Sequence, residues 1–296
     1  RCSGMNTTRL LCCLGYILLA PFIGGLLDGM DRKLSARMQG RTGPSVLQPF
    51  YDIIKLFHKQ IFLVNHSQFF LVGSYLVFVI FSGALMFAGY DLLMSFFALT
   101  TAAMFLVLAS CSTHSPFSAM ASQRELLQMM SYEPMVLLAC VGFYLATGSF
   151  QVSDIIQSDM SPIVFLPGFF IGFVYILTIK MRKSPFDIST AHHAHQEMVR
   201  GVTTEMVGSL YAITQIAEWY ENVMLLGIVA LFFINDNPIS WPLAIVGVLI
   251  TYFFEILIDN TTARLKWSKV LLSAWLVTLL FGGLNLLVLD LLIKYL

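Results

Sequence analysis

Long apolar stretches separated by short polar segments make up most of this chain, and eight of them are long enough to cross a membrane. A membrane-spanning helix needs about 17–25 mostly apolar residues. The eight candidate spans are Leu10–Leu27, Phe69–Tyr90, Leu92–Ser110, Glu133–Phe150, Ile163–Met181, Met206–Ile234, Trp241–Ile258 and Val270–Ile293. The pattern predicts an all-α integral membrane protein with about eight transmembrane helices.

Composition agrees with a membrane environment. The 296 residues are 57% hydrophobic and 11% charged, whereas a soluble domain carries about 25% charged residues. The formal net charge is zero, which excludes the basic surface that nucleic-acid binding requires. No small-residue cleavage pattern follows Leu10–Leu27, so we expect a retained helix rather than a signal peptide.

No linker divides the chain, and we expect a single multi-pass membrane domain over residues 1–296. Basic residues accumulate in short cytoplasmic loops. With the N-terminus outside, fourteen of the seventeen Lys and Arg residues fall in inner segments. This asymmetry predicts cytoplasmic loops at about residues 28–68, 111–132, 182–205 and 259–269.

The first inner segment contains a short amphipathic pattern. Its opening, DRKLSARMQGRTGP, is charged and glycine-containing, which favours irregular, partly solvated backbone. Apolar residues then recur at helical spacing between Ser45 and Phe62, while Asp52, Lys55 and Lys59 occupy other faces. A helix of this length should lie along the membrane surface rather than cross it.

Several carboxylates lie inside or next to the apolar spans. A charged side chain at the bilayer centre costs about 2.5–3.5 kcal/mol on the lenient insertion scale, so such residues need an explanation. One interpretation is a proton relay, and the alternative is structural pairing with Lys, Arg or Tyr between helices. Because several acids face one bundle, we favour a relay, and its candidate members are Glu133, Glu205, Glu218, Glu221 and Glu255.

A polar segment from Lys180 to Glu221 interrupts the apolar pattern and holds three of the six histidines. The spacing of His192, His193, His195 and Glu197 permits a metal site, but the HExxH arrangement is absent and we expect no metal here. Imidazoles titrate near neutrality, which suits proton conduction or an interface. A solvated polar loop is the remaining alternative.

The five cysteines do not form a cluster of thiolate ligands. They show no CxxC spacing and lie mostly in apolar surroundings, where Cys behaves as a small hydrophobic residue. Iron–sulfur clusters are held by groups of thiolates. We therefore expect no cofactor in this chain.

Two long motifs resemble the heel-type (NuoH-like) membrane subunit of respiratory complex I. The first is DRKLSARMQGRTGPSVLQPFYDIIKLFHKQ, and the second is SPFDISTAHHAHQEMVRGVTTEMVG followed by AEWYE. The quinone-reducing branch of that family is rich in Glu where this chain has His193-Ala194-His195, and its first loop is longer. In both respects the chain is most similar to the membrane subunit of Ech-type, energy-converting nickel–iron hydrogenases.

The resemblance implies that the chain is one subunit of an oxidoreductase complex in the cytoplasmic membrane of a prokaryote. A peripheral arm would pass electrons from ferredoxin through iron–sulfur clusters to a nickel–iron centre that makes hydrogen. The implied partners are a nickel–iron large subunit, iron–sulfur small subunits and an antiporter-like membrane subunit. The implied inner entrance of the proton path and docking surface for the arm consists of Asp187, His192, His193, His195, Glu197, Arg32, Arg37 and Arg41.

Three other functions remain open. A quinone-binding heel subunit of a complex I-like dehydrogenase belongs to the same family, and a related sulfur-reducing complex would place its chemistry in another chain. A stand-alone ion transporter is a different class. Such transporters often show internal repeats with broken helices in matching halves, which the sequence does not display.

Overall fold

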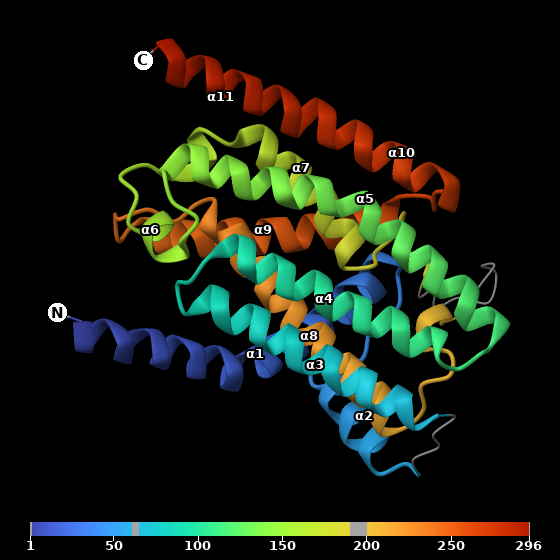
Figure 1. The fold of residues 1–296 in the computed structure, drawn as a ribbon. Helices are drawn as coiled ribbons and strands as arrows, with labels where there is room; N and C mark the ends of the chain where they lie inside the picture. Colours follow the sequence, from blue (N-terminus) through green and yellow to red (C-terminus); the bar gives the residue numbers. More distant parts are fainter. Residues whose placement is uncertain (1, 61–64, 190–199, 296) are drawn as a thin grey trace.

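The computed structural model describes residues 2–60, 65–189 and 200–295, and their regular structure is helical apart from an isolated bridge between Asp91 and Gln151. The helices form a bundle (Figure 1). They are α1 (Cys2–Met38), α2 (Gln48–Phe57), α3 (His66–Phe87), α4 (Leu92–Cys111), α5 (Pro116–Thr147), α6 (Val152–Ile156), α7 (Pro167–Lys180), α8 (Ser209–Leu231), α9 (Ser240–Thr261), α10 (Trp267–Val277) and α11 (Leu284–Tyr295). A π-helical turn, Thr278–Gly283, joins α10 to α11.

Each of the eight predicted spans contains one long helix, which confirms the all-α membrane fold. Six helices in the described part are long and apolar enough to cross a bilayer: α1, α3, α4, α5, α9 and the continuous α10–α11. The other two are α7, which has 14 residues, and α8, which has 23 residues and carries polar side chains in its first half. Many large apolar side chains on α1, α9 and α10 are exposed, as lipid-facing surfaces require.

Two segments that were predicted to be loops are largely helical in the structure. Helix α1 continues eleven residues past Leu27, so the supposedly irregular segment after it is helical to Met38. Helix α5 begins at Pro116, and most of the predicted 111–132 loop belongs to it. Glu133 therefore lies in the middle of α5 and not at its start. The hydropathy windows stop at the first charges, but charges that find partners inside the bundle do not end a helix.

The predicted surface helix is present as α2, and it is shorter than the 45–62 stretch, with 10 residues. Its outward face exposes Tyr51, Ile54 and Phe57, whereas Pro49 is buried. Helix α2 lies at the end of the bundle opposite α6 and the two chain termini (Figure 1). This position fits a helix that rests in the membrane interface.

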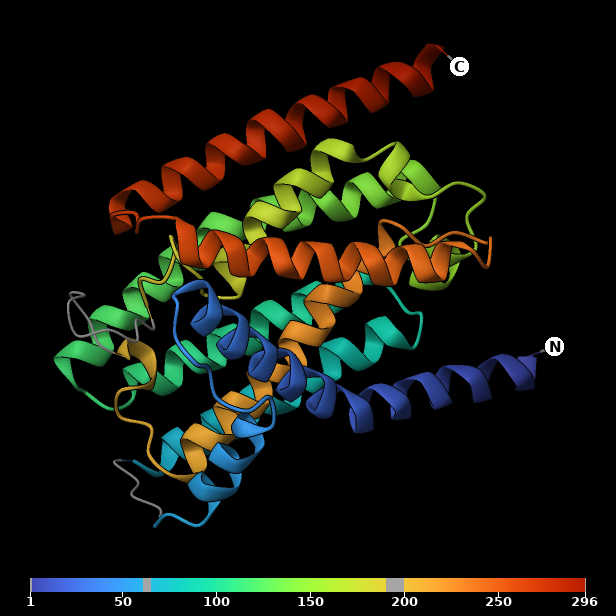
Figure 2. The ribbon, with the colours of Figure 1, turned by 180° about the vertical axis from the view of Figure 1, so that it is seen from behind.

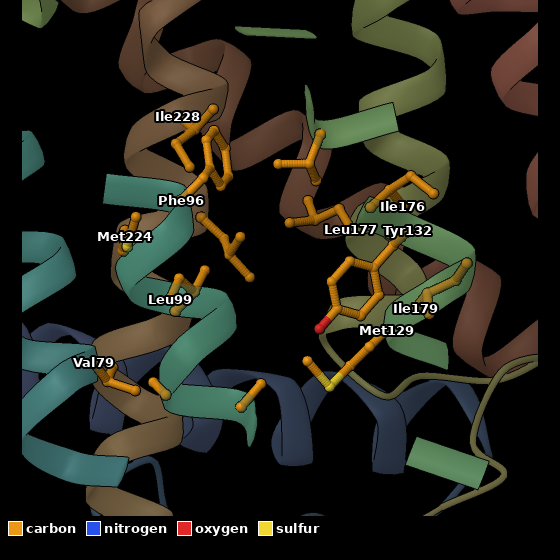
Figure 3. Close-up of a cluster of buried hydrophobic side chains, with 14 of the residues drawn as sticks. Val79, Phe96, Leu99, Met129, Tyr132, Ile176, Leu177, Ile179, Met224 and Ile228 are labelled. Atoms are coloured by element: carbon orange, nitrogen blue, oxygen red, sulfur yellow. The ribbon is translucent and has the colours of Figure 1, made fainter. Parts of the chain in front are cut away.

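The apolar core fills the space between α3, α4, α5, α7 and α8. Figure 3 shows Phe96 and Leu99 of α4 facing Tyr132 of α5 and Leu177 of α7 across this core. On the opposite side of α8, the glycines of α1 allow close approach: a Cβ on Gly24 would lie 2.6 Å from the Cβ of Trp219. Helix α8 therefore runs diagonally between the core and α1 (Figure 2). Its polar first half is enclosed on several sides.

Candidate functional site

The end of α7 and the turn after it place three cations inside the bundle: Lys180, Arg182 and Lys183. Lys180 is the last residue of α7, and Arg182 has a φ of 51°, a left-handed conformation that is uncommon for residues other than glycine. Such backbone costs about 1–3 kcal/mol and persists where surrounding contacts fix it. Here the turn directs the side chains of Lys180 and Arg182 towards acidic residues of α5 and α8.

Arg182 binds two carboxylates from different helices. Its Nη1 donates to Glu218 Oε1 of α8 at 2.7 Å, and its Nη2 donates to Glu125 Oε1 of α5 at 3.1 Å. Gln215 Nε2 donates to the other oxygen of Glu218 at 2.7 Å. Burial would lower the pKa of Arg182, but Glu125 and Glu218 outweigh it and raise this pKa above its ordinary value.

A second ion pair lies next to the first. Lys180 Nζ is 2.9 Å from Glu221 Oε1, and the Tyr75 hydroxyl donates to Glu221 Oε2 at 3.3 Å. The ammonium also lies 4.5 Å from the ring centroid of Tyr132. The Lys180 and Glu221 side chains are only 6% and 12% exposed, so this pair is almost fully removed from water.

The two pairs form one cluster, which we call the carboxylate cluster: Glu125, Lys180, Arg182, Glu218 and Glu221. Small cavities lined by members of both pairs connect them. The cluster holds two cations and three carboxylates, so it is neutral only when one carboxyl carries a proton. In a low-dielectric site an uncompensated charge is costly, and proton uptake removes that cost.

One polar cavity reaches the carboxylate cluster, and a second polar cavity adjoins the first. A cavity of about 830 Å³ lies between α1, α8 and α9, and its walls include Asp31, Arg182 and Glu218. A second cavity of about 480 Å³ lies beside α2. Both are lined by Arg32, whose guanidinium bridges Asp28 at 3.0 Å and Asp52 of α2 at 2.9 Å. The charged walls can hold water, so they offer a hydrated route to Glu218.

On another wall of the larger cavity, Lys183 Nζ lies 2.9 Å from Asp31 Oδ2 and 5.1 Å from the ring centroid of Tyr252. Asp259 accepts a hydrogen bond from the Ser184 amide at 2.8 Å. Glu255, one turn earlier on α9, is wholly buried, and among the described residues neither of its carboxyl oxygens has a hydrogen-bond partner. Glu255 is thus separate from the carboxylate cluster.

The structure brings together only some of the residues that the sequence singled out. Glu218 and Glu221 share the cluster, and both are paired with cations, as the structural alternative described. Glu133 is half-buried in α5 and Glu205 lies in a turn before α8; within the described residues, neither makes an ion pair. These placements leave the relay assignment of all five acids a prediction.

The predicted inner entrance is only partly described. Asp187 pairs with Arg264 at 3.5 Å, and Arg32 joins α1 to α2. Arg37 and Arg41 are exposed. The other members lie outside the described residues: His192, His193, His195 and Glu197. In the part of the chain that the structure describes, no three His, Cys, Asp or Glu side chains are arranged to hold a metal ion.

Sequence reasoning missed the cations and one acid of the cluster. It counted Lys180 and Arg182 only as loop charges that set the topology, and it placed Glu125 in a loop. A usable signal was present, because Glu125 and Tyr132 are seven residues apart and so share a helix face. The left-handed turn at Arg182 has no comparable signal in the sequence.

Comparisons with known proteins agree on one family. The family model described as NADH dehydrogenase matches residues 11–290. The chain is 28% identical to NADH-ubiquinone oxidoreductase chain 1 of Mycosarcoma maydis, over 91% of this chain and 90% of that protein. It is 27% identical to a subunit of the NADH-quinone oxidoreductase of Syntrophotalea carbinolica, over 96% and 97% of the two chains.

A solved structure shares the fold. A chain of the membrane-bound sulfane sulfur reductase, an archaeal respiratory membrane complex, superposes with a TM-score of 0.85 at 22% identity, covering 95% of this chain and 99% of that one. At this identity the likeness concerns the fold alone. The family match covers nearly the whole chain and confirms the resemblance seen in the two motifs. This membrane protein belongs to the NADH dehydrogenase family, together with the matching subunits of the NADH-quinone oxidoreductases.

Proposed function

We propose that this chain is the membrane subunit of a complex I-like oxidoreductase that anchors a peripheral redox arm and relays protons beneath it. The observation that carries the proposal is the carboxylate cluster, which has one more carboxylate than it has cations. A cluster of this charge holds a proton at little cost, and the polar cavities supply water for its exchange. The N-terminus would face outside, and the cavities beside α2 would open to the cytoplasm.

The contacts support one order for proton movement. Water in the larger cavity reaches Glu218, which shares Arg182 with Glu125. Small cavities continue from these residues to Glu221, whose second oxygen accepts from the Tyr75 hydroxyl. A proton that enters at Glu218 therefore arrives between α3, α5 and α8, deep in the bundle. Glu133, Glu205 and Glu255 would serve as further relay positions outside this cluster.

For the reaction of the whole complex, we propose a nickel–iron hydrogenase arm that takes electrons from reduced ferredoxin. The His193-Ala194-His195 sequence and the short first loop support this branch of the family. The nickel–iron centre and iron–sulfur clusters would belong to partner subunits, with an antiporter-like membrane subunit at the other side. Arg32, Arg37, Arg41, Asp187 and the 190–199 segment would form the docking surface.

A quinone-binding heel subunit is the second candidate, because the relatives include a subunit of NADH-quinone oxidoreductase. Ligand sites for apolar molecules are lined predominantly by apolar and aromatic side chains. The two large cavities next to α1 are instead lined by charged residues such as Asp31, Arg32 and Lys183. This lining favours water and ions over a quinone.

Gentle purification of the complex separates the candidates. The hydrogenase proposal expects nickel and iron in the complex and hydrogen evolution from reduced ferredoxin; quinone reduction without nickel would refute it and leave the relay intact. For the relay, Glu218→Gln and Glu221→Gln should lower the protons translocated per electron in membrane vesicles while the arm stays assembled. The control is Asp290→Asn on an exposed carboxylate of α11. Unchanged translocation in both cluster variants would refute the relay.

A further inference from the structure

A deep apolar groove runs between α7 and α9, away from the carboxylate cluster. Its volume is about 780 Å³. Val174 and Tyr175 of α7 form one wall, Ile250 and Phe254 of α9 form the other, and Phe233 lies at one end. Figure 2 shows α9 running alongside α7 on this face of the bundle. The groove belongs to neither the relay nor the docking surface.

Water is a poor occupant of this groove. A buried water needs two to four polar partners, and nearly all side chains that line the groove are apolar. An unfilled void would forfeit the dispersion contacts of its walls. At this depth in a bilayer, the neighbouring solvent is the lipid acyl chain, which fills the void without losing hydrogen bonds.

The length of the groove suits an acyl chain. The α9 residues that line the groove extend from Leu243 to Ile258, about 22 Å at 1.5 Å per residue. An extended hydrocarbon chain can lie along a groove of this length and make dispersion contacts with both of its walls.

Basic residues border one end of the groove. The Leu265 amide donates to the Pro185 carbonyl at 3.1 Å, and both residues line this end. The exposed Lys266 and Lys269 follow directly, together with Trp267, which is 41% exposed. Lysine and tryptophan next to the end of a membrane-spanning helix are typical of the membrane interface, where ammonium groups bind phosphate oxygens.

We propose that this groove is a specific site for one anionic phospholipid, with an acyl chain between α7 and α9 and the phosphate beside Lys266 and Lys269. The bound lipid substitutes for the direct side-chain packing that the two helices lack along the groove. The proposal is independent of the redox chemistry and of the proton relay.

The acyl-chain site is tested by photo-crosslinking of the whole complex in nanodiscs that contain a phosphatidylglycerol with a diazirine in its acyl chain. Label should appear in the peptides of α7 and α9 that line the groove. Val174→Trp and Ile250→Trp fill the groove from opposite walls, and each should remove that label. Leu249→Trp, on an exposed α9 position outside the groove, is the matched control and should keep it. Unchanged label in both groove variants would overturn the proposal.

The headgroup site is tested by competition with unlabelled lipid. Lysines near a membrane surface contribute about 1 kcal/mol each to anionic-lipid binding, so Lys266→Gln with Lys269→Gln should weaken phosphatidylglycerol binding about thirtyfold and leave phosphatidylcholine binding unchanged. Equal loss for both lipids would overturn the headgroup assignment. A crosslink from Ile250→Cys to a helix of another subunit, in place of lipid, would overturn the proposal as a whole.

Discussion

Replacing Arg182 by Met should destabilise the protein more than removing either of its carboxylate partners. Arg182→Met leaves Glu125 and Glu218 close together without their shared cation, and these side chains are only 8% and 28% exposed. Removing one partner of a buried ion pair costs about 3–5 kcal/mol. Glu125→Gln or Glu218→Gln leaves Arg182 with one carboxylate and imitates the protonated acid that the cluster can hold, so each should cost only about 0.5–1.5 kcal/mol, the range for an ordinary hydrogen bond.

The assay is thermal unfolding of the purified complex in detergent, with Lys55→Met as the control because Lys55 is exposed. About 4 kcal/mol corresponds to a melting temperature roughly 10 °C lower in a chain of this size. The triple variant Arg182→Met, Glu125→Gln, Glu218→Gln should recover much of the loss, since no unpaired charge remains. Arg182→Met melting like the control, or Glu125→Gln costing more than Arg182→Met, would refute this account of the cluster.

The same variant should respond to pH in a defined direction. Without Arg182, two carboxylates repel each other in the folded state, and the uptake of a proton by the pair relieves that repulsion. Stability then rises as pH falls, because the folded state holds more protons than the unfolded state. The difference in melting temperature between wild type and Arg182→Met should therefore become smaller as the pH is lowered from mildly alkaline to mildly acidic. A deficit that grows on acidification would contradict this reasoning.

Three further substitutions test the packing around the site. Glu255→Gln should be neutral or stabilising in thermal unfolding, because its buried carboxyl accepts no hydrogen bond from the described residues. Gly29→Ala should lower the melting temperature because its Cβ would overlap the Val46 backbone, whereas Gly15→Ala, with open space around it, should not. Asn285→Leu removes two hydrogen bonds to the start of α7 and should cost about 1–3 kcal/mol.

Hydropathy located every long helix but not the helix ends. Hydropathy recognises only the residues that lipid tolerates. The predicted span in α1 therefore ended at Leu27, and the predicted span in α5 began only at Glu133. Both helices continue through charged residues because those residues face protein: Asp28 pairs with Arg32 one turn later, and Glu125 pairs with Arg182. Such pairs depend on which helices become neighbours, and a single sequence does not give that information.

The site was predictable on one helix only. Glu218 and Glu221 are three residues apart, and helical spacing alone places them on one face. Their cationic partners come from the segment after α7, where the left-handed backbone at Arg182 decides the direction of the side chain. The periodicity of the sequence carries no signal for that turn. The prediction that His193 and His195 serve the docking surface stays untested, since they lie outside the described residues.

Ion pairing of the relay carboxylates raises the question of how they can pass protons. A carboxylate that has one cation to itself loses that partner's attraction when it is protonated, which opposes transfer. Arg182 instead contacts Glu125 and Glu218 together. When either acid takes the proton, the guanidinium keeps the other as its partner, so a proton can move between them without creating a buried unpaired charge. The Glu221 carboxylate also has two partners, because it accepts a hydrogen bond from the Tyr75 hydroxyl and pairs with Lys180. The sharing of one cation by two acids thus makes a strongly paired cluster compatible with proton transfer, and Arg182 is its central residue.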